Sequence, residues 1–121
     1  MSHVILQVIR HVLVTASCCI ALTGCFRTKC TPDQVRTTLS ELERTRASLS
    51  VADSVLRTVQ LPPGCQLHVG SFERERRQIG AIVVDAKRAW FTQWNIQVTV
   101  RFDSTDHVDG VDAQYSAESA F

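Results

Sequence analysis

The stretch Trp94–Phe102, which reads WNIQVTVRF, decides the fold class of this chain. Every second residue in it is apolar, and the residues between them are Asn, Gln, Thr and Arg. Such alternation is typical of a β-strand with one buried face and one solvated face. The side chains expected to point into a core are Trp94, Ile96, Val98, Val100 and Phe102.

Two shorter segments on either side of this strand also alternate. They cover residues 82–87 and 111–115, and their apolar positions are Ile82, Val84, Ala86, Val111, Ala113 and Tyr115. Val108 is out of step by one residue, and Gly110 is placed to absorb the slip as a β-bulge or as the first residue of the strand. With a turn at residues 103–106, the pattern predicts a three-strand antiparallel meander.

The segment before the strands is predicted to be helical. Thr31-Pro32-Asp33-Gln34 combines an N-cap Thr, a Pro at the first helical position and a Gln that completes a capping box. Val35, Leu39, Leu42 and Leu49 follow on one helical face. The pattern fits one long helix, or two helices joined near residues 48–50.

Two further segments are assigned from weaker patterns. Residues 54–61 fit a helix or a strand, and Pro62-Pro63-Gly64 ends either one. Val69, Phe72 and Ile79 fall on one helical face, so a second, surface-lying helix is expected over residues 66–78.

The fold class predicted from these elements is α+β. Two or more N-terminal helices are expected to pack on a small antiparallel three-strand meander. This arrangement is expected to be a single domain that spans residues 31–121.

The N-terminal segment differs sharply from the rest of the chain. The first 24 residues carry a single charge, Arg10, whereas all twelve acidic residues lie at or beyond Asp33. The apolar run from Val12 to Leu22 is about half of the ~20 residues that a membrane-spanning helix needs, and it ends in small residues. This layout predicts a cleaved signal peptide over residues 1–24.

Leu22-Thr23-Gly24-Cys25 resembles the lipobox of bacterial lipoproteins: an aliphatic residue, two small residues and a cysteine. The resemblance implies that Cys25 carries the lipid, becomes the first residue of the mature protein and starts a lipidated tether at residues 25–30. Because Phe26 rather than Asp follows, it also implies an outer-membrane location facing the periplasm. The alternative is an ordinary signal peptide with an incidental cysteine.

Two cysteines, Cys30 and Cys65, follow the lipobox. An oxidising compartment favours a disulfide between them. The competing interpretation is a metal site, but the chain lacks the CxxC or paired His spacing that zinc sites use. We therefore expect a Cys30–Cys65 disulfide, with no metal and no cofactor.

Nothing in the sequence predicts catalysis. GxSxG, HExxH, GxxxxGK[ST] and GxGxxG are all absent, and only His68 and His107 follow the predicted signal peptide. Residues 25–121 contain twelve basic and twelve acidic side chains, a balance that does not favour binding to nucleic acid. We expect a protein that is not an enzyme and has no nucleic-acid partner.

Aspartates recur every third residue at Asp103, Asp106, Asp109 and Asp112. An EF-hand calcium loop needs ligands at alternate positions and a Glu at its end, and this run has neither. The four side chains are predicted to be solvated carboxylates of a turn and of a strand.

Five side chains are candidates for contact with a partner. Trp90, Phe91 and Trp94 lie between two predicted strands, where aromatic residues either fill the core or anchor a partner. Arg74 and Arg77 lie in the predicted second helix, where they either pair with neighbouring Glu residues or bind an anion.

The order of lipobox, capped helix pair and three-strand meander resembles the small outer-membrane lipoproteins of the BamE type. That resemblance implies an interaction or envelope-assembly protein that is anchored by lipid, contacts another envelope protein and catalyses no reaction. One alternative is an inhibitor or immunity lipoprotein that blocks an enzyme at the cell envelope. Another is an accessory of a periplasmic hydrolase with weak activity of its own.

Overall fold

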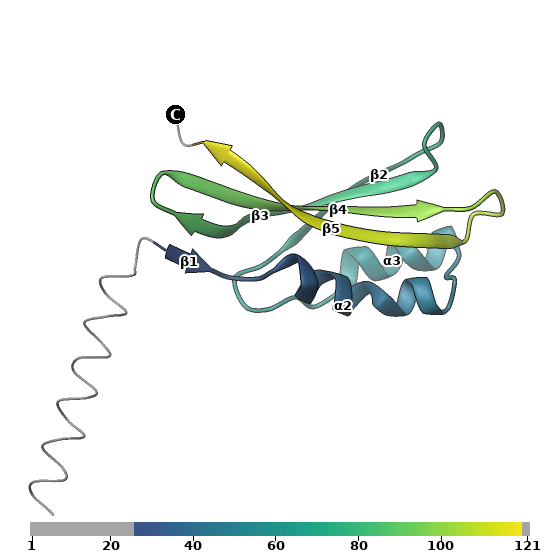
Figure 1. Ribbon diagram of the computed structural model, residues 1–121. Helices are drawn as coiled ribbons and strands as arrows, with labels where there is room; N and C mark the ends of the chain where they lie inside the picture. Colours follow the sequence, from purple (N-terminus) through teal and green to yellow (C-terminus); the bar gives the residue numbers. More distant parts are fainter. Residues whose placement is uncertain (1–25, 120–121) are drawn as a thin grey trace, which may run out of the picture.

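The computed structural model of the chain describes the backbone of residues 26–119 and the side chains of residues 27–117 (Figure 1). The predicted signal peptide and Cys25 lie outside the described residues. Strands account for 48% of the described residues and helices for 25%. The elements in chain order are β1 (Phe26–Thr28), α2 (Pro32–Arg44), α3 (Leu49–Thr58), β2 (Leu67–Glu73), β3 (Gln78–Ala89), β4 (Thr92–Phe102) and β5 (Val108–Ser119).

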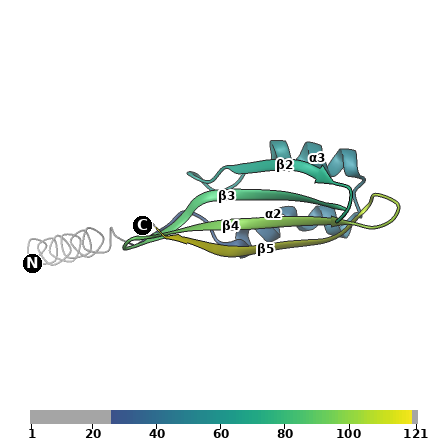
Figure 2. The same cartoon turned by 90° about the horizontal axis from the view of Figure 1, so that it is seen from above.

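The five strands form one antiparallel sheet, which curls into a half-barrel. β3, β4 and β5 are consecutive neighbours. β2 and β1 share the other edge of β3: β2 pairs with residues 78–83, and β1 pairs with residues 87–89. Both helices lie along one face of the sheet, with α2 against β5 and α3 against β2 (Figures 1 and 2).

The prediction of helices packed on a small three-strand meander is therefore wrong. β3, β4 and β5 do follow one another as a meander, but they are part of a larger curled sheet that also contains β1 and β2. The residues expected to form the tether include β1, which pairs with the end of β3. Neighbouring strands are joined by hydrogen bonds between backbone groups, which every residue type carries. The side-chain pattern therefore reveals little about which distant segment pairs with the edge of β3.

The expected second helix over residues 66–78 is also wrong, because Leu67–Glu73 is strand β2. A β-bulge lies between Val69 and Phe72. Val69 and Phe72 are therefore partly buried in the same core although they are three residues apart. Because of the bulge, the two apolar residues of this strand have the three-residue spacing that is typical of a helix.

A second bulge interrupts β3 and changes which residues face the core. Val83 and Ala86 are both buried although they are three residues apart, whereas Val84 is 46% exposed. The alternation predicted for this segment fails at the bulge. Asp85 has a left-handed φ of 57° there, and its N–H donates a hydrogen bond to Oδ1 of Asn95 (3.0 Å).

Helix α2 begins with the predicted capping box, which is confirmed. The Gln34 N–H donates to Oγ1 of Thr31 (3.2 Å), and the Thr31 N–H donates to Oε1 of Gln34 (2.9 Å). These two bonds satisfy backbone and side-chain groups reciprocally at the first turn. The apolar face of α2 is buried through Val35, Leu39 and Leu42.

A break after α2 decides between one helix and two. Arg46 has a left-handed φ of 49°, and the Ala47 N–H donates to the carbonyl of Leu42 (3.0 Å), as in a Schellman motif. The second helix, α3, starts at Leu49 and extends to Thr58, so most of the ambiguous segment is helical.

The prediction for β4 is confirmed at four of its five apolar positions, but it is wrong for Asn95, which is expected on the solvated face and is only 7% exposed. Ile96, Val98, Val100 and Phe102 are at most 5% exposed, whereas Trp94 is half-buried. The slip predicted around Gly110 is present as a register shift, in which Arg101 pairs with Gly110 and the next β4 residue pairs with Val108. The core lies between this face of the sheet and the two helices.

Cys30 and Cys65 form a disulfide whose Cα atoms lie 6.5 Å apart, as the sequence predicted. The bond joins the start of α2 to the loop that precedes β2. Because it closes 35 residues of chain, restriction of the unfolded state contributes about 4 kcal/mol on the chain-entropy model.

Candidate functional site

The domain has two ends that differ in chemistry (Figure 1). The β1 end consists of β1 and the β3–β4 turn at residues 89–92. The distal end consists of the β2–β3 turn at residues 73–78 and the β4–β5 loop at residues 103–107. A polar network and an open groove lie together at the distal end.

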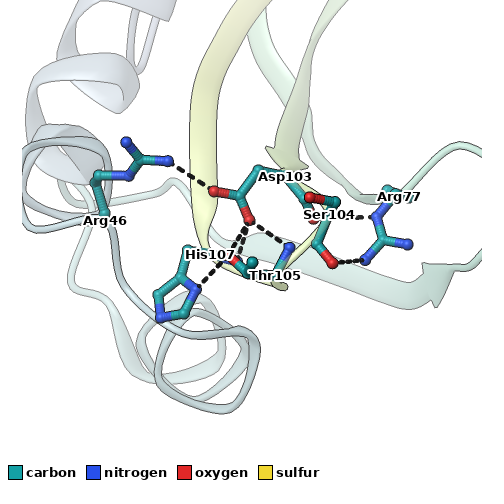
Figure 3. Close-up of polar contacts among 6 residues, drawn as sticks. All are labelled: Arg46, Arg77, Asp103, Ser104, Thr105 and His107. Carbon is teal, nitrogen blue, oxygen red and sulfur yellow. Dashed lines mark hydrogen bonds and ion pairs between the residues drawn. The ribbon is translucent and has the colours of Figure 1, made fainter.

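Asp103 organises the β4–β5 loop (Figure 3). Its Oδ1 accepts hydrogen bonds from the Thr105 hydroxyl (2.7 Å), the Thr105 N–H (2.9 Å) and the His107 N–H (3.1 Å). Its Oδ2 accepts a hydrogen bond from Arg46 (2.7 Å). The Thr105 hydroxyl, followed by the His107 N–H, holds the pKa of Asp103 well below its usual range, so the carboxyl stays ionised at neutral pH.

The hydroxyl of Thr105 connects this carboxylate to an imidazole. Oγ1 of Thr105 lies 3.0 Å from Nδ1 of His107. Because an ionised carboxylate only accepts, the Thr105 hydroxyl donates its one hydrogen to Asp103 and accepts from Nδ1 of His107. A hydrolytic triad places the imidazole between the acid and the hydroxyl, so the order here suits the holding of a loop rather than the activation of a nucleophile.

Arg77 reaches the same loop from the β2–β3 turn. Its Nε donates to the carbonyl of Asp103 (3.0 Å), and its Nη2 donates to the carbonyl of Ser104 (3.1 Å) and to the carboxylate of Asp106 (2.6 Å). The guanidinium therefore clamps the loop. Arg74, the other arginine candidate, is exposed in the turn and is not in a helix.

Backbone hydrogen bonds attach the loop to the start of α3. The Leu49 N–H donates to the carbonyl of Asp106 (2.9 Å), and the Val108 N–H donates to the carbonyl of Ala47 (2.8 Å). Together these two bonds form an isolated β-bridge between Ser48, the residue before α3, and His107 in the loop. The loop and the start of α3 are therefore held against each other.

An open groove with a volume of about 570 Å³ lies between α3 and this loop. Leu49, Phe72 and Ile79 supply its apolar lining from α3, β2 and β3. The polar residues that complete the groove, called here the distal groove, are Ser48, Ser50, Asp53, Thr105, Asp106 and His107. An apolar lining with a few oriented polar groups is the usual composition of a binding site.

Replacement of Asp103 by Asn is expected to lower the melting temperature at neutral pH, because the charge that accepts these hydrogen bonds is lost. Since folding lowers the pKa of Asp103, its stabilising contribution is complete above the unfolded-state pKa of about 3.9 and declines as the pH falls below it. The difference between wild type and variant should therefore shrink in acid, as thermal melts at several pH values would measure.

The matched control is Asp109→Asn, which changes an exposed carboxyl on β5. Its effect on the melting temperature is expected to be small at every pH. A difference between wild type and Asp103→Asn that stays constant into acid would contradict the role assigned to the carboxylate.

The structure separates the aromatic candidates. Trp90 and Phe91 form the tip of the β3–β4 turn, where they are 67% and 66% exposed. Trp94 is half-buried on β4, with its ring edge-on to Tyr115 at 6.0 Å between centroids. Nζ of Lys87 lies 5.6 Å from both of these rings. The exposed tip is at the opposite end of the domain from the arginine candidates (Figure 1).

The four regularly spaced aspartates do not converge. Asp106 binds Arg77 in the loop, Asp112 pairs with Arg101 across β4 and β5, and Asp109 is exposed. Within residues 26–119, no group of three or more His, Cys, Asp or Glu side chains is arranged to hold a metal ion. In the same residues, neither helix has the length and apolar character required to cross a membrane.

The sequence did not reveal the distal groove. The sequence pattern predicts a helix at Phe72 and places Leu49 only on an apolar helical face. The one local signal was the turn at residues 103–106, and it does not predict that α3 lies against it. Lipidation at Cys25 stays a prediction, because that residue lies outside the described part of the chain.

Comparison of the chain with protein-family models, with curated proteins and with solved structures finds no significant match. Two features of the domain bear on its function: the distal groove and the position of β1 at the other end of the sheet.

Proposed function

We propose that this protein is a lipid-anchored interaction protein of the bacterial cell envelope, and that its distal groove binds a segment of another envelope protein in the periplasm. The observation that carries the proposal is the position of the groove. It lies at the end of the sheet opposite to β1, the strand that directly follows Cys25 (Figure 1). An anchor at Cys25 would leave the groove accessible from the periplasm.

The hydrogen bonds that hold the residues around the groove support a binding role. Asp103, Arg46 and Arg77 hold the loop through side-chain hydrogen bonds, and backbone hydrogen bonds attach the loop to α3. A site that is ordered before binding loses less conformational entropy when a partner arrives.

The chemistry of the groove suggests what the partner offers. Both acids at the groove already have cationic partners, since Asp53 lies 3.2 Å from Arg57 and Asp106 lies 2.6 Å from Arg77. The remaining lining is apolar or contributes hydroxyl groups, such as that of Ser50, together with the imidazole of His107. A segment with a bulky apolar side chain and backbone hydrogen-bonding groups fits this surface better than a charged segment does.

The experiment that tests this proposal is site-specific photo-crosslinking in intact cells. A photoreactive amino acid at Ser50 lies at the groove, whereas the same amino acid at Thr37 is on the exposed side of α2. We expect a discrete cross-linked product of one mass from Ser50 that is absent from Thr37. Mass spectrometry of that product identifies the partner.

Equal products from both positions, or none from Ser50, would contradict a partner at the distal groove. The identity of the captured protein also separates the two functions that the sequence left open. An assembly component supports the scaffold role, whereas an enzyme whose activity falls on binding supports the inhibitor role.

A further inference from the structure

The β1 end presents an exposed aromatic pair on a turn that is unusual for such residues. Trp90 and Phe91 are 67% and 66% exposed at the tip between β3 and β4. Trp90 has a φ of 55°, a left-handed conformation that favours Gly or Asn and that bulky side chains rarely adopt. Backbone strain of this kind concentrates at positions with a function.

Cations gather directly behind this tip. Arg27 of β1 and Arg88 of β3 are cross-strand partners, an arrangement in which like charges repel. Lys29 and Arg88 both lie near Asp85, at 3.2 Å and 3.4 Å. Among the side chains of residues 27–117, the structure has no ion pair for Arg27. Two exposed arginines thus lie opposite each other, and Asp85 pairs with Arg88 and Lys29.

The charge balance of this end is positive. The cations that line its surface together are Arg27, Lys29 and Arg88, and Asp85 is the acid among them. Glu118 lies on β5 and pairs with Gln93 of β4, which in turn pairs with Arg88 of β3. Strand β4 therefore separates the backbone of Glu118 from that of Arg88. A hollow of about 160 Å³ lined by Arg27, Lys29, Asp85 and Arg88 opens at this end. The surface is therefore complementary to anions.

Chain connectivity brings the predicted lipid anchor to the same place. Phe26 pairs with Ala89, Cys25 precedes Phe26 and Trp90 follows Ala89. The residue that follows the predicted anchor in the sequence therefore pairs with the residue that precedes the aromatic tip.

We infer that the β1 end docks on an anionic lipid surface, with Trp90 and Phe91 at the boundary between headgroups and acyl chains and with Arg27 and Arg88 on the lipid phosphates. Tryptophan favours that boundary, and basic side chains near an anionic leaflet add attraction. The inference rests on the proposed function, because the anchor at Cys25 is what would bring this end to a membrane. It adds an orientation, because docking at this end points the distal groove away from the membrane.

The test uses the full chain, purified from membranes, with Trp94→Phe so that Trp90 is the remaining one of the two tryptophans. The protein is placed in vesicles of brominated phosphatidylglycerol or of brominated phosphatidylcholine. Bromine on the acyl chains quenches a tryptophan that reaches them. We expect strong quenching of Trp90 in phosphatidylglycerol and weaker quenching in phosphatidylcholine.

Charge variants test the ionic part of the contact in the same background. Arg27→Gln with Arg88→Gln is expected to shift the docked–undocked equilibrium on phosphatidylglycerol about 30-fold toward the undocked state. The matched control is Arg74→Gln with Arg76→Gln, which removes the same charge from the exposed β2–β3 turn at the other end. The control is expected to leave the quenching unchanged, and circular dichroism verifies that each variant is folded.

Absence of quenching in phosphatidylglycerol overturns the inference, and so does an equal effect of the two arginine pairs. A further result overturns it: Trp90 is shielded from a water-soluble quencher in native envelopes but is not quenched by brominated lipid in vesicles. A protein would then cover the tip. Mass spectrometry of the N-terminal peptide shows independently whether Cys25 carries a lipid. Failure of the proposed anchor is thus distinguished from failure of the docking surface.

Discussion

Replacement of Val98 by Asp is expected to unfold the domain. Val98 lies in the middle of β4, is 1% exposed and belongs to the core between the sheet and the helices. An unpaired carboxylate at this position costs about 3–5 kcal/mol, which is comparable to the whole stability of a small domain. Thermal melts followed by circular dichroism, on a secreted form that lacks the lipobox cysteine, measure the loss.

The control for this prediction is Gln97→Asp, one residue away on the solvated face of the same strand. Gln97 is exposed and pairs with Ile82 and Gln114, so an acid there meets no like charge across the sheet. Thr99 is less suitable, because its cross-strand partner is Asp112. Equal destabilisation by the two variants would show that another surface covers the outer face of β4.

Replacement of Cys25 by Ser is expected to abolish incorporation of labelled palmitate and to leave an uncleaved or soluble product. The reason is chemical, since the proposed lipid is attached through the sulfur that Ser lacks. Labelling in cells, followed by fractionation of membranes and periplasm, measures both effects. A variant that still incorporates palmitate and still sediments with membranes would contradict the proposed anchor.

Cys18→Ser and Cys19→Ser are the matched controls for that experiment. Thr15 and Ala16 stand where a lipobox at either cysteine would need an aliphatic residue. Both variants should therefore keep normal labelling and normal localisation. Loss of palmitate in either one would move the attachment site away from Cys25.

Local patterns predicted the parts of this fold that depend on neighbouring residues. The capping box at Thr31 and the buried face of β4 are set by spacings of three and two residues, so they can be read directly from the chain. The same logic failed where a bulge changes the spacing. Val69 and Phe72 in β2, and Val83 and Ala86 in β3, are each three residues apart in a strand.

The candidate site illustrates a different limit of sequence patterns. Arg46, Arg77 and Asp103 are separated by 26 to 57 residues, yet they meet in one network. Nothing in the residues around Arg77 indicates whether its guanidinium faces solvent, binds a partner or clamps a loop 26 residues away. The turn at Asp103 was predictable, whereas the groove that it borders was not.

The sequence by itself determined the strand character of β4, the start of α2 and the prediction of a lipid anchor at Cys25. It also indicated the Cys30–Cys65 pair, because few cysteines remain after the lipobox. Only the tertiary structure decided that β1 and β2 share one edge of β3 and that exposed Trp90 and the distal groove lie at opposite ends. The physical reason is that periodicity records burial along one segment, whereas strand pairing and site assembly depend on backbone hydrogen bonds and contacts between distant segments.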